Sequence, residues 1–407
     1  MSGQVHGTAR AAGSLSITNV VVFDGVTEEL REGPITIVDG RIVELGGSVT
    51  TSDRVVDGRG GCVIPGLIDA HFHAYGISLN LLELEASPLS YVALMAARRL
   101  ASALHRGFTT VRDVAGGDPG LAKAIDQRLL ASPRYLYTGP ALTQTGGQGD
   151  PRPADLELCA CGGHAGEIVD GVDPLRRAVR ERFRRGAHAI KIMTSGGVVS
   201  LTDPLRIPQY SADEVRVVTE EATRRGSYVA AHAYSPEAIV HSVVNGVRSI
   251  EHGNLLDQET AELMAQHGAF LVPTLATYDA MDRKGADLGM APVSLAKNRE
   301  VLEAGQRAVE LALEAGVKVG FGTDLMGTLE EEQLHGLRLQ VDVAGPLETL
   351  RSATSVNAQL IGRNDLGRVE SGAVADLVIL DGNPFEDPSL IWSTDRERVV
   401  VQGGMPL

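Results

Sequence analysis

The sequence predicts an α/β protein built on a (β/α)8 TIM-type barrel, with a small β-sandwich subdomain formed by both ends of the chain. Short apolar runs alternate with longer helical patterns over residues 63–364, which is typical of βα units in a parallel sheet. Eight such units over roughly 260 residues match the size of one barrel. Short β-like runs separated by turns flank this region on both sides.

The two ends of the chain carry the β-like runs. The first 14 residues are small and polar without periodicity, and we expect a disordered tail over 1–14. β-like runs follow at 15–23, 34–38, 41–45 and 54–57, and again at 375–380 and 398–401. We therefore expect residues 15–62 and 365–407 to form the β-subdomain together, and residues 63–364 to form the barrel.

Within the barrel region, the strand candidates stand at 63–70, 109–114, 135–138, 189–193, 228–233, 249–251, 270–273 and 317–323. Helical patterns fill most of the intervals, for example 91–105, 212–225, 236–245 and 260–267, and several of them end at a glycine. Two inserts, 141–172 and 195–210, interrupt the alternation. Long loops in compact domains are often functional lids.

The composition limits the classes of molecule that we expect the protein to bind. The chain of 407 residues has a formal net charge of -15, which argues against nucleic acid and anionic membranes. The basic run 176–185 has helical spacing and indicates a solvated helix face rather than a polyanion site. Cys62, Cys159 and Cys161 are read as plain thiols, and no export signal or long apolar stretch is present. We expect a cytoplasmic protein with a small-molecule substrate.

Metal-capable side chains stand at or near the ends of five strand candidates. They are His71, His73, Lys191, His232, His252 and Asp324. The carboxyl ends of parallel barrel strands gather at one face, where active sites are built. Imidazole nitrogen and carboxylate oxygen suit zinc and similar ions. Each residue alone is more often structural, but the joint pattern predicts a metal site. Lys191 lies in an apolar strand, where a charged amine would be costly.

Longer stretches carry a family resemblance. Val63-Ile64-Pro65-Gly66-Leu67-Ile68-Asp69-Ala70-His71-Phe72-His73 resembles the entry motif of the amidohydrolase superfamily, and Ser249-Ile250-Glu251-His252-Gly253 and Gly320-Phe321-Gly322-Thr323-Asp324 resemble its later motifs. Gln144-Thr145-Gly146-Gly147-x-Gly149-Asp150, residues 190–197 and Ala231-His232-Ala233-Tyr234 are similar to the Xaa-Pro dipeptidase (prolidase)-like branch. That branch includes Xaa-Arg dipeptidases and ochratoxin-type amide hydrolases.

The resemblance implies two divalent metal ions, with zinc as the first choice. It implies that CO2 converts Lys191 to a carbamate that bridges them. It further implies that His71, His73 and Asp324 hold one ion while His232 and His252 hold the other. Asp324 would act as general base and then general acid. A symmetric homo-oligomer, such as an octamer, is also implied.

Four residues are candidates for substrate contacts. Gln148 stands where the branch usually has a histidine, and we expect it to face the substrate carbonyl as a hydrogen-bond donor that cannot shuttle a proton. A solvent-facing loop residue is the other interpretation. Tyr234 resembles a group that contacts the substrate's terminal carboxylate, although a core tyrosine would also fit. Arg152 and His164, in the first insert, are further candidates for an anionic end.

These features predict a metal-dependent enzyme that hydrolyses a C–N bond of a dipeptide or N-acyl amino acid, including an ochratoxin-type amide. Hydrolysis of a cyclic amide, as in imidazolonepropionase-like proteins, or of a carbamate or urea is the alternative. A metal-binding homologue without turnover is a third interpretation. The complete set of six ligand positions argues against it.

Overall fold

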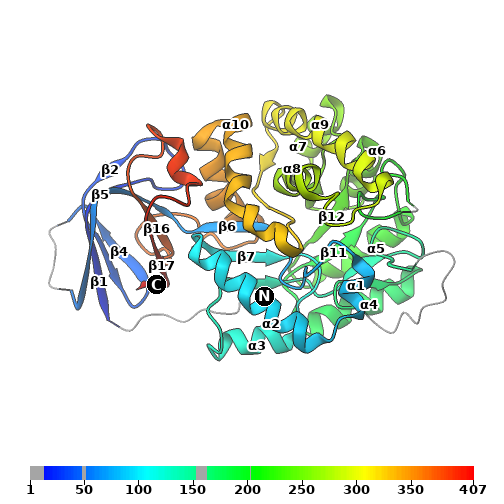
Figure 1. The fold of residues 1–407 in the computed structure, drawn as a ribbon, viewed down its shortest axis with the longest axis horizontal. Helices are drawn as coiled ribbons and strands as arrows, with labels where there is room; N and C mark the ends of the chain where they lie inside the picture. The colour runs from blue at the N-terminus through cyan, green and yellow to red at the C-terminus, as the bar shows by residue number, and fades with distance from the viewer. Residues whose placement is uncertain (1–12, 48–51, 153–162, 202) are drawn as a thin grey trace.

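The computed structural model describes residues 13–47, 52–152, 163–201 and 203–407, and both chain ends meet in one sheet at one end of the molecule (Figure 1). The strand order is β18-β17-β16-β5-β1-β3-β4, with β2 beside β1. The strands are β1 (Ser14–Val22), β2 (Arg31–Glu32), β3 (Ile35–Val38), β4 (Arg41–Leu45), β5 (Arg54–Pro65), β16 (Leu377–Leu380), β17 (Arg398–Gln402) and β18 (Met405–Pro406). The described residues form one hydrogen-bonded sheet here, so the two-layer sandwich and the domain boundaries stay predictions.

The barrel strands are parallel and lie in two hydrogen-bonded groups. One holds β6 (Leu67–Phe72), β7 (Phe108–Asp113) and β8 (Arg134–Tyr137). The other has the order β10-β9-β11-β12-β13-β14-β15. Its members are β9 (Ala141–Thr143), β10 (Gly166–Ile168), β11 (Ile190–Met193), β12 (Val229–Ala233), β13 (Ser249–His252), β14 (Phe270–Val272) and β15 (Lys318–Val319).

Backbone hydrogen bonds join the two groups into a closed TIM-type barrel. On one side, the His188 N–H donates to the Tyr137 carbonyl at 2.8 Å. On the other, the Ala70 N–H donates to Phe321 at 2.9 Å, and the Asp324 N–H donates to His71 at 2.7 Å. Gly322 allows this approach, since a Cβ there would lie 2.5 Å from the His71 Cβ. Closure therefore brings Asp324 beside the end of β6.

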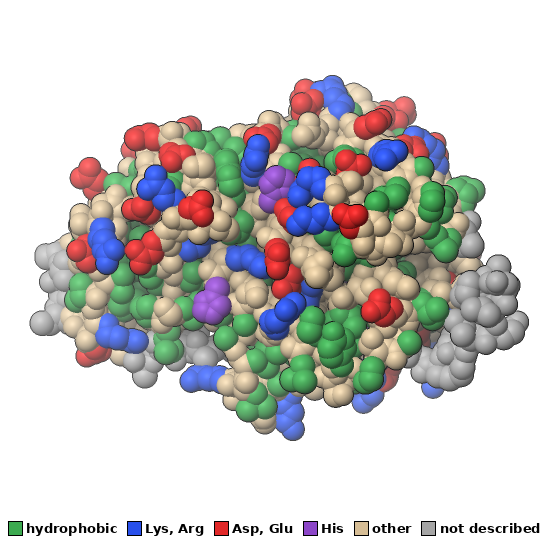
Figure 2. Space-filling view, in the orientation of Figure 1, with side chains coloured by type: hydrophobic (Ala, Val, Ile, Leu, Met, Phe, Trp, Pro, Cys, Tyr) green, Lys and Arg blue, Asp and Glu red, His purple; other side chains and the backbone are tan. Residues whose placement is uncertain are grey.

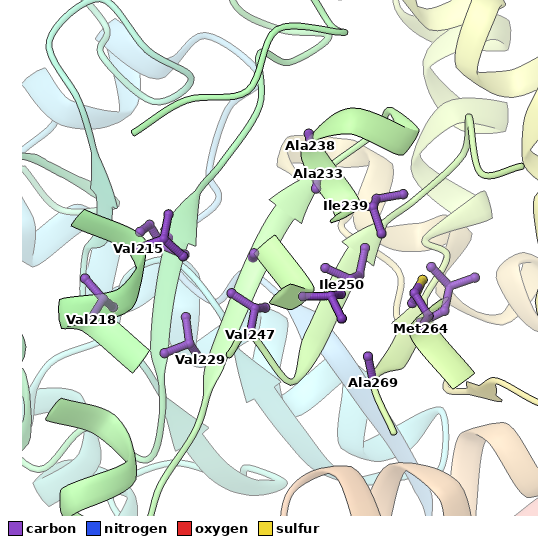
Figure 3. Close-up of a cluster of buried hydrophobic side chains, with 14 of the residues drawn as sticks. Val215, Val218, Val229, Ala233, Ala238, Ile239, Val247, Ile250, Met264 and Ala269 are labelled. Atoms are coloured by element: carbon purple, nitrogen blue, oxygen red, sulfur yellow. The ribbon is translucent and has the colours of Figure 1, made fainter. Parts of the chain in front are cut away.

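Helices pack around the barrel (Figure 1). They are α1 (Leu81–Ala86), α2 (Leu89–His105), α3 (Pro119–Asp126), α4 (Val172–Arg184), α5 (Ala212–Arg224), α6 (Pro236–Val244), α7 (Gln258–Gln266), α8 (Leu275–Lys284), α9 (Pro292–Glu314), α10 (Gln333–Arg351) and α11 (Asn357–Leu360). Figure 3 shows Val215 and Val218 of α5 near Val229 of β12, and Ile250 of β13 near Met264 of α7, in one buried cluster. Aliphatic side chains thus fix each helix against its strands.

The first and last predicted barrel strands are shorter in the structure than the sequence indicated. Residues 63–65 belong to β5 of the terminal sheet, and the barrel strand begins only at Leu67. The Gly66 N–H donates to the Asp376 carbonyl at 2.7 Å, so the chain passes between the two sheets at this glycine. The last strand is only Lys318–Val319, because the chain turns toward β6 after Gly320, whose N–H still donates to the Leu271 carbonyl of β14 at 2.8 Å.

The surface is mixed in charge. On the face shown in Figure 2, Lys and Arg side chains are interspersed with Asp and Glu. The predicted basic helix is α4, but Arg182 is buried and pairs with Glu167 at 2.7 Å, so that residue is not part of a solvated face. Among the described residues, no helix is long and apolar enough to cross a membrane. Cys62 is a buried free thiol, while Cys159, Cys161 and most of the predicted tail lie outside the described residues.

Candidate metal centre

Three of the predicted ligands lie together where β6 meets the segment after β15. His71 lies near the end of β6 and His73 directly follows the strand, and one ligand atom from each of these two histidines and from Asp324 falls within 4.8 Å of the others. The His73 Nε2 lies 2.8 Å from Asp324 Oδ1, and the His71 Nε2 lies 3.5 Å from it. Asp324 has φ 54°, a left-handed backbone that a non-glycine residue holds only where its surroundings enforce it.

The other three predicted ligands face the same cavity from neighbouring strands. His232 is the second-last residue of β12 and His252 is the last residue of β13. Their ring centroids are 4.5 Å apart. The His252 centroid is also 4.9 Å from that of His71. Lys191, on β11, lines this cavity, and its buried Nζ has no hydrogen-bond partner within the described residues. The barrel therefore gathers all six side chains.

Hydrogen bonds hold one ring nitrogen of three histidines and leave the other open. The His71 Nδ1 lies 2.7 Å from Glu251 Oε2, and the His232 Nε2 lies 3.0 Å from the Gly196 carbonyl. The His252 Nδ1 lies 2.8 Å from both the Thr274 and the Tyr278 hydroxyls. Partners of this kind fix the tautomer and orientation of metal-binding imidazoles. The ring nitrogens that form no hydrogen bond among the described residues are the Nε2 of His71, the Nδ1 of His232 and the Nε2 of His252.

Burial keeps these three histidines neutral and increases the neutral fraction of Lys191. It lowers the pKa of His232 to about 3, with the Lys191 ammonium adding to the effect. Burial also lowers the pKa of His71 and of His252 well below the usual value. The pKa of Lys191 falls to about 8, chiefly by desolvation and against the attraction of Glu251 and Asp324. Neutral imidazoles are the form that binds metals, and a neutral amine is the form that reacts with CO2.

Glu251 and Tyr278 belong to the site although sequence reasoning did not single them out. Glu251 is fully buried and also accepts from Arg112 Nη2 at 2.7 Å, which balances its charge. The sequence could have indicated Glu251, because it lies on the same strand face as Ser249, two residues away, and directly precedes the candidate ligand His252. Tyr278 lies in α8, and its position gives no such signal.

The predicted substrate residues separate into two pairs. Gln148 and Tyr234 line the cavity. Gln148 is 7% exposed, so it is not a solvent-facing loop residue, and its Oε1 has no partner among the described residues. Its side chain lies against Gly197, where a Cβ would come within 2.1 Å of it. The Tyr234 hydroxyl is 2.8 Å from that of Tyr278.

Arg152 and His164 do not line the cavity. Arg152 forms two hydrogen bonds with the Asp150 carboxylate, at 2.8 Å and 2.7 Å. The His164 Nε2 lies 3.0 Å from the Ser87 carbonyl. Their substrate contacts stay predictions. Apart from the polar groups named above, the wall is mainly apolar; it includes Leu79, Leu81, Leu84, Met193, Val198, Val199, Met281 and Met326.

Comparisons with known proteins match this arrangement. A model of the amidohydrolase family matches residues 62–405. The chain belongs to this amidohydrolase family. An ochratoxinase of Aspergillus niger is 31% identical to this amidohydrolase over 411 residues, covering 94% of this chain and 84% of that protein. A prolidase structure complexed with N-methylphosphonate-L-proline is 43% identical, with a TM-score of 0.93 and coverage of 97% and 99%.

A Xaa-Pro dipeptidase structure with bound methionine in the active site is 29% identical, with a TM-score of 0.86 and coverage of 97% and 99%. The amidohydrolase therefore lies in the branch of prolidases and ochratoxinases, and it is a hydrolase that acts on C–N bonds. The resemblance predicted from the sequence is confirmed.

The residues fit the divalent metals that amidohydrolases typically use. Histidine nitrogen and carboxylate oxygen from His71, His73 and Asp324 form a candidate ion site among the described residues. The unpartnered Lys191 Nζ is a second sign, because a buried amine without hydrogen bonds is costly unless another group joins it.

Proposed function

We propose that this amidohydrolase is a binuclear metal-dependent enzyme that cleaves the amide bond of a dipeptide or an N-acyl amino acid. The observation that carries the proposal is the convergence of six metal-capable side chains, five buried and Asp324 partly exposed, on one cavity with a mainly apolar wall. The similarity to prolidase and ochratoxinase proteins supports the bond type.

In this proposal, His71, His73 and Asp324 hold one ion, and His232 and His252 hold the other. Lys191 would carry a CO2-derived carbamate, which would supply negatively charged oxygen ligands to the metal centre. Its low pKa and missing hydrogen-bond partner support that modification. Zinc is our first choice for the native ion. Bound divalent ions polarise a substrate carbonyl and lower the pKa of water.

The protein's own side chains supply the proton transfer and the contacts with the substrate. Asp324 is 18% exposed at its side chain and lies at the cavity, so it can accept a proton from water and return it to the leaving nitrogen. Gln148 donates from its amide nitrogen to the substrate carbonyl. Tyr234 and Tyr278 form a hydroxyl pair beside His252 and present donors to the polar end of the substrate.

One observation favours a second candidate, hydrolysis of a neutral cyclic amide, carbamate or urea. Besides Lys191, no lysine or arginine lines the cavity among the described residues. A substrate carboxylate would therefore meet only neutral donors. The two proposals differ in whether turnover depends on a free carboxylate.

The test compares metal-depleted and zinc-loaded enzyme on Xaa-Pro, Xaa-Arg, N-acyl-Phe and ochratoxin-like amides, each with a carboxyl-amidated control. We expect turnover that chelation removes, that zinc restores and that amidation of the carboxylate abolishes. Equal turnover of the amidated controls would select the second candidate. No turnover of any of these substrates by metal-loaded enzyme would contradict the dipeptide and N-acyl proposal.

A further inference from the structure

The carboxylate of Glu85 joins two separate parts of the cavity wall. Glu85 is in α1, and it accepts hydrogen bonds from three consecutive backbone N–H groups that precede and begin β10. The Ala165 N–H lies 3.0 Å from its Oε1 and the Gly166 N–H lies 3.1 Å from it, while the His164 N–H donates to Oε2. Successive backbone N–H groups of this kind form a concave receptor for an anion.

Both partners of this contact face the metal centre. Leu81, Leu84 and Glu85 of α1 line the cavity from one side, and Ala165 and Gly166 line it from the other. On this flank, the Glu85 carboxylate therefore bridges two parts of the wall of the cavity that holds the six candidate ligands.

Little else anchors α1. The helix has six residues, and only Leu84 is buried. The His164 imidazole adds one contact to the Ser87 carbonyl at 3.0 Å. Among the described residues Glu85 forms no ion pair, so the backbone N–H groups alone stabilise its charge. Helix α1 therefore depends on this carboxylate for its position.

We propose that Glu85 is a specificity-determining positioning residue. It fixes α1 against residues 164–166 and so sets the size of an apolar subsite that receives a bulky hydrophobic group of the amide substrate. This inference rests on the proposed function, because it assigns the subsite to a substrate of that reaction.

The test uses Glu85→Gln, which keeps the shape of the side chain but turns an acceptor into a donor toward N–H groups. Glu83→Gln is the matched control, because Glu83 is in the same helix and its carboxylate accepts only from Ser78 Oγ, at 2.7 Å, among the described residues. Gly163→Ala tests the contact from the other side, since its Cβ would lie 2.3 Å from the Gly166 carbonyl oxygen and 2.7 Å from both Glu85 oxygens and so would push residues 164–166 and the carboxylate apart.

Two readouts are measured on the zinc-loaded full chain. One is amide hydrogen exchange at residues 164–166. The other is kcat/KM for amide substrates that differ only in the size of one apolar end, varied first at the acyl group and then at the amine. We expect wild type and Glu83→Gln to prefer the larger group. Glu85→Gln and Gly163→Ala should lose at least about 10-fold of that preference and gain exchange, with kcat within about 3-fold of wild type.

An unchanged size preference, or an equal loss of kcat on all substrates, would overturn the specificity role. Unchanged exchange at 164–166 in Glu85→Gln would overturn the contact itself. If metal-loaded wild type hydrolyses no amide while the exchange still rises in Glu85→Gln, the proposed function fails and the specificity role fails with it, while the contact between α1 and residues 164–166 stands.

Discussion

At the scale of single residues, the cavity contains buried polar atoms that lack partners. Lys191 Nζ and Gln148 Oε1 are both buried without a hydrogen bond among the described residues. Leaving such a group unpaired costs about 1–3 kcal/mol of stability, so folded proteins keep few of them. Both side chains line the cavity with the candidate ligands. In the proposed function, a carbamate would form on the Lys191 nitrogen, and the Gln148 oxygen would accept from an N–H or O–H of the substrate while the Gln148 amide nitrogen donates to its carbonyl.

Gln148 and Gly197 give a prediction at this scale. Gln148→Ala removes the proposed donor to the substrate carbonyl, and we expect kcat to fall on the order of 100-fold with little change in KM. Gly197→Ala places a Cβ 2.1 Å from the Gln148 side chain and displaces it, so its effect should be similar. The double variant should be no worse than either single variant, because both remove one interaction.

Steady-state kinetics of the three variants and thermal melts check this prediction. Additive losses in the double variant would show that Gly197 acts through something other than Gln148. A kcat equal to that of wild type in Gln148→Ala would exclude the donor role.

At the scale of elements, Lys297 of α9 organises the second insert. Its ammonium donates to the backbone carbonyls of Gly197 at 3.0 Å, Ser200 at 2.8 Å and Asp203 at 2.7 Å. The same loop supplies Val198 and Val199 to the cavity wall and Gly196 to the His232 ring. One cation on a helix thus orders a loop that has no regular secondary structure of its own.

Lys297→Met should loosen this loop while keeping the apolar stem of the side chain. We expect KM to rise about 10-fold because the wall is no longer held in place, with a smaller change in kcat. Arg299→Met, two residues away and largely exposed, is the control and should match wild type. If Lys297→Met binds substrate as wild type does, the loop is held by its other contacts.

Much of the barrel could be predicted because its strands are short apolar runs with polar residues at their ends. The candidates at 189–193 and 228–233 differ from β11 and β12 by one residue at one end, and the candidate at 109–114 is shifted from β7 by one residue. The first strand was extended wrongly, because 63–65 are as apolar as 67–70 and only the tertiary contact of Gly66 with Asp376 separates two sheets. The last was too long, because its end is set by the approach of Gly322 to His71.

The residues of the candidate site that lie at or near strand ends could likewise be predicted. The six candidate ligands could be found because strand ends gather at one face of a barrel. Tyr278 and Glu85 could not, because each reaches the cavity from a helix whose placement depends on tertiary packing. Arg152 was expected near the substrate; it pairs with Asp150, two residues away, and its substrate contact stays a prediction.

At the scale of the whole molecule, one buried ion pair joins the terminal sheet to the barrel. Arg134 of β8 donates from Nε to Asp376 Oδ2 at 2.7 Å and from Nη2 to Oδ1 at 3.1 Å. Each side chain is 3% exposed. Asp376 also accepts from the Gly403 N–H at 2.7 Å, and its carbonyl accepts from Gly66. The carboxylate therefore links the C-terminal strands of the terminal sheet to β8, and the backbone carbonyl of the same residue binds the chain where it enters the barrel.

Asp376→Asn keeps the shape but leaves the Arg134 guanidinium buried without a counter-charge. We expect the free energy of unfolding to fall by about 3 kcal/mol, because removing one partner of a buried pair leaves an uncompensated charge. Replacing both, as in Arg134→Met with Asp376→Leu, should recover much of that loss. Denaturant unfolding, followed by near-ultraviolet circular dichroism and by limited proteolysis of the terminal sheet, measures both. If the sheet becomes protease-sensitive while the barrel unfolds at the wild-type denaturant concentration, the ion pair stabilises the sheet alone. A single shifted transition means that the sheet and the barrel unfold as one unit, which is what a carboxylate bound to both predicts.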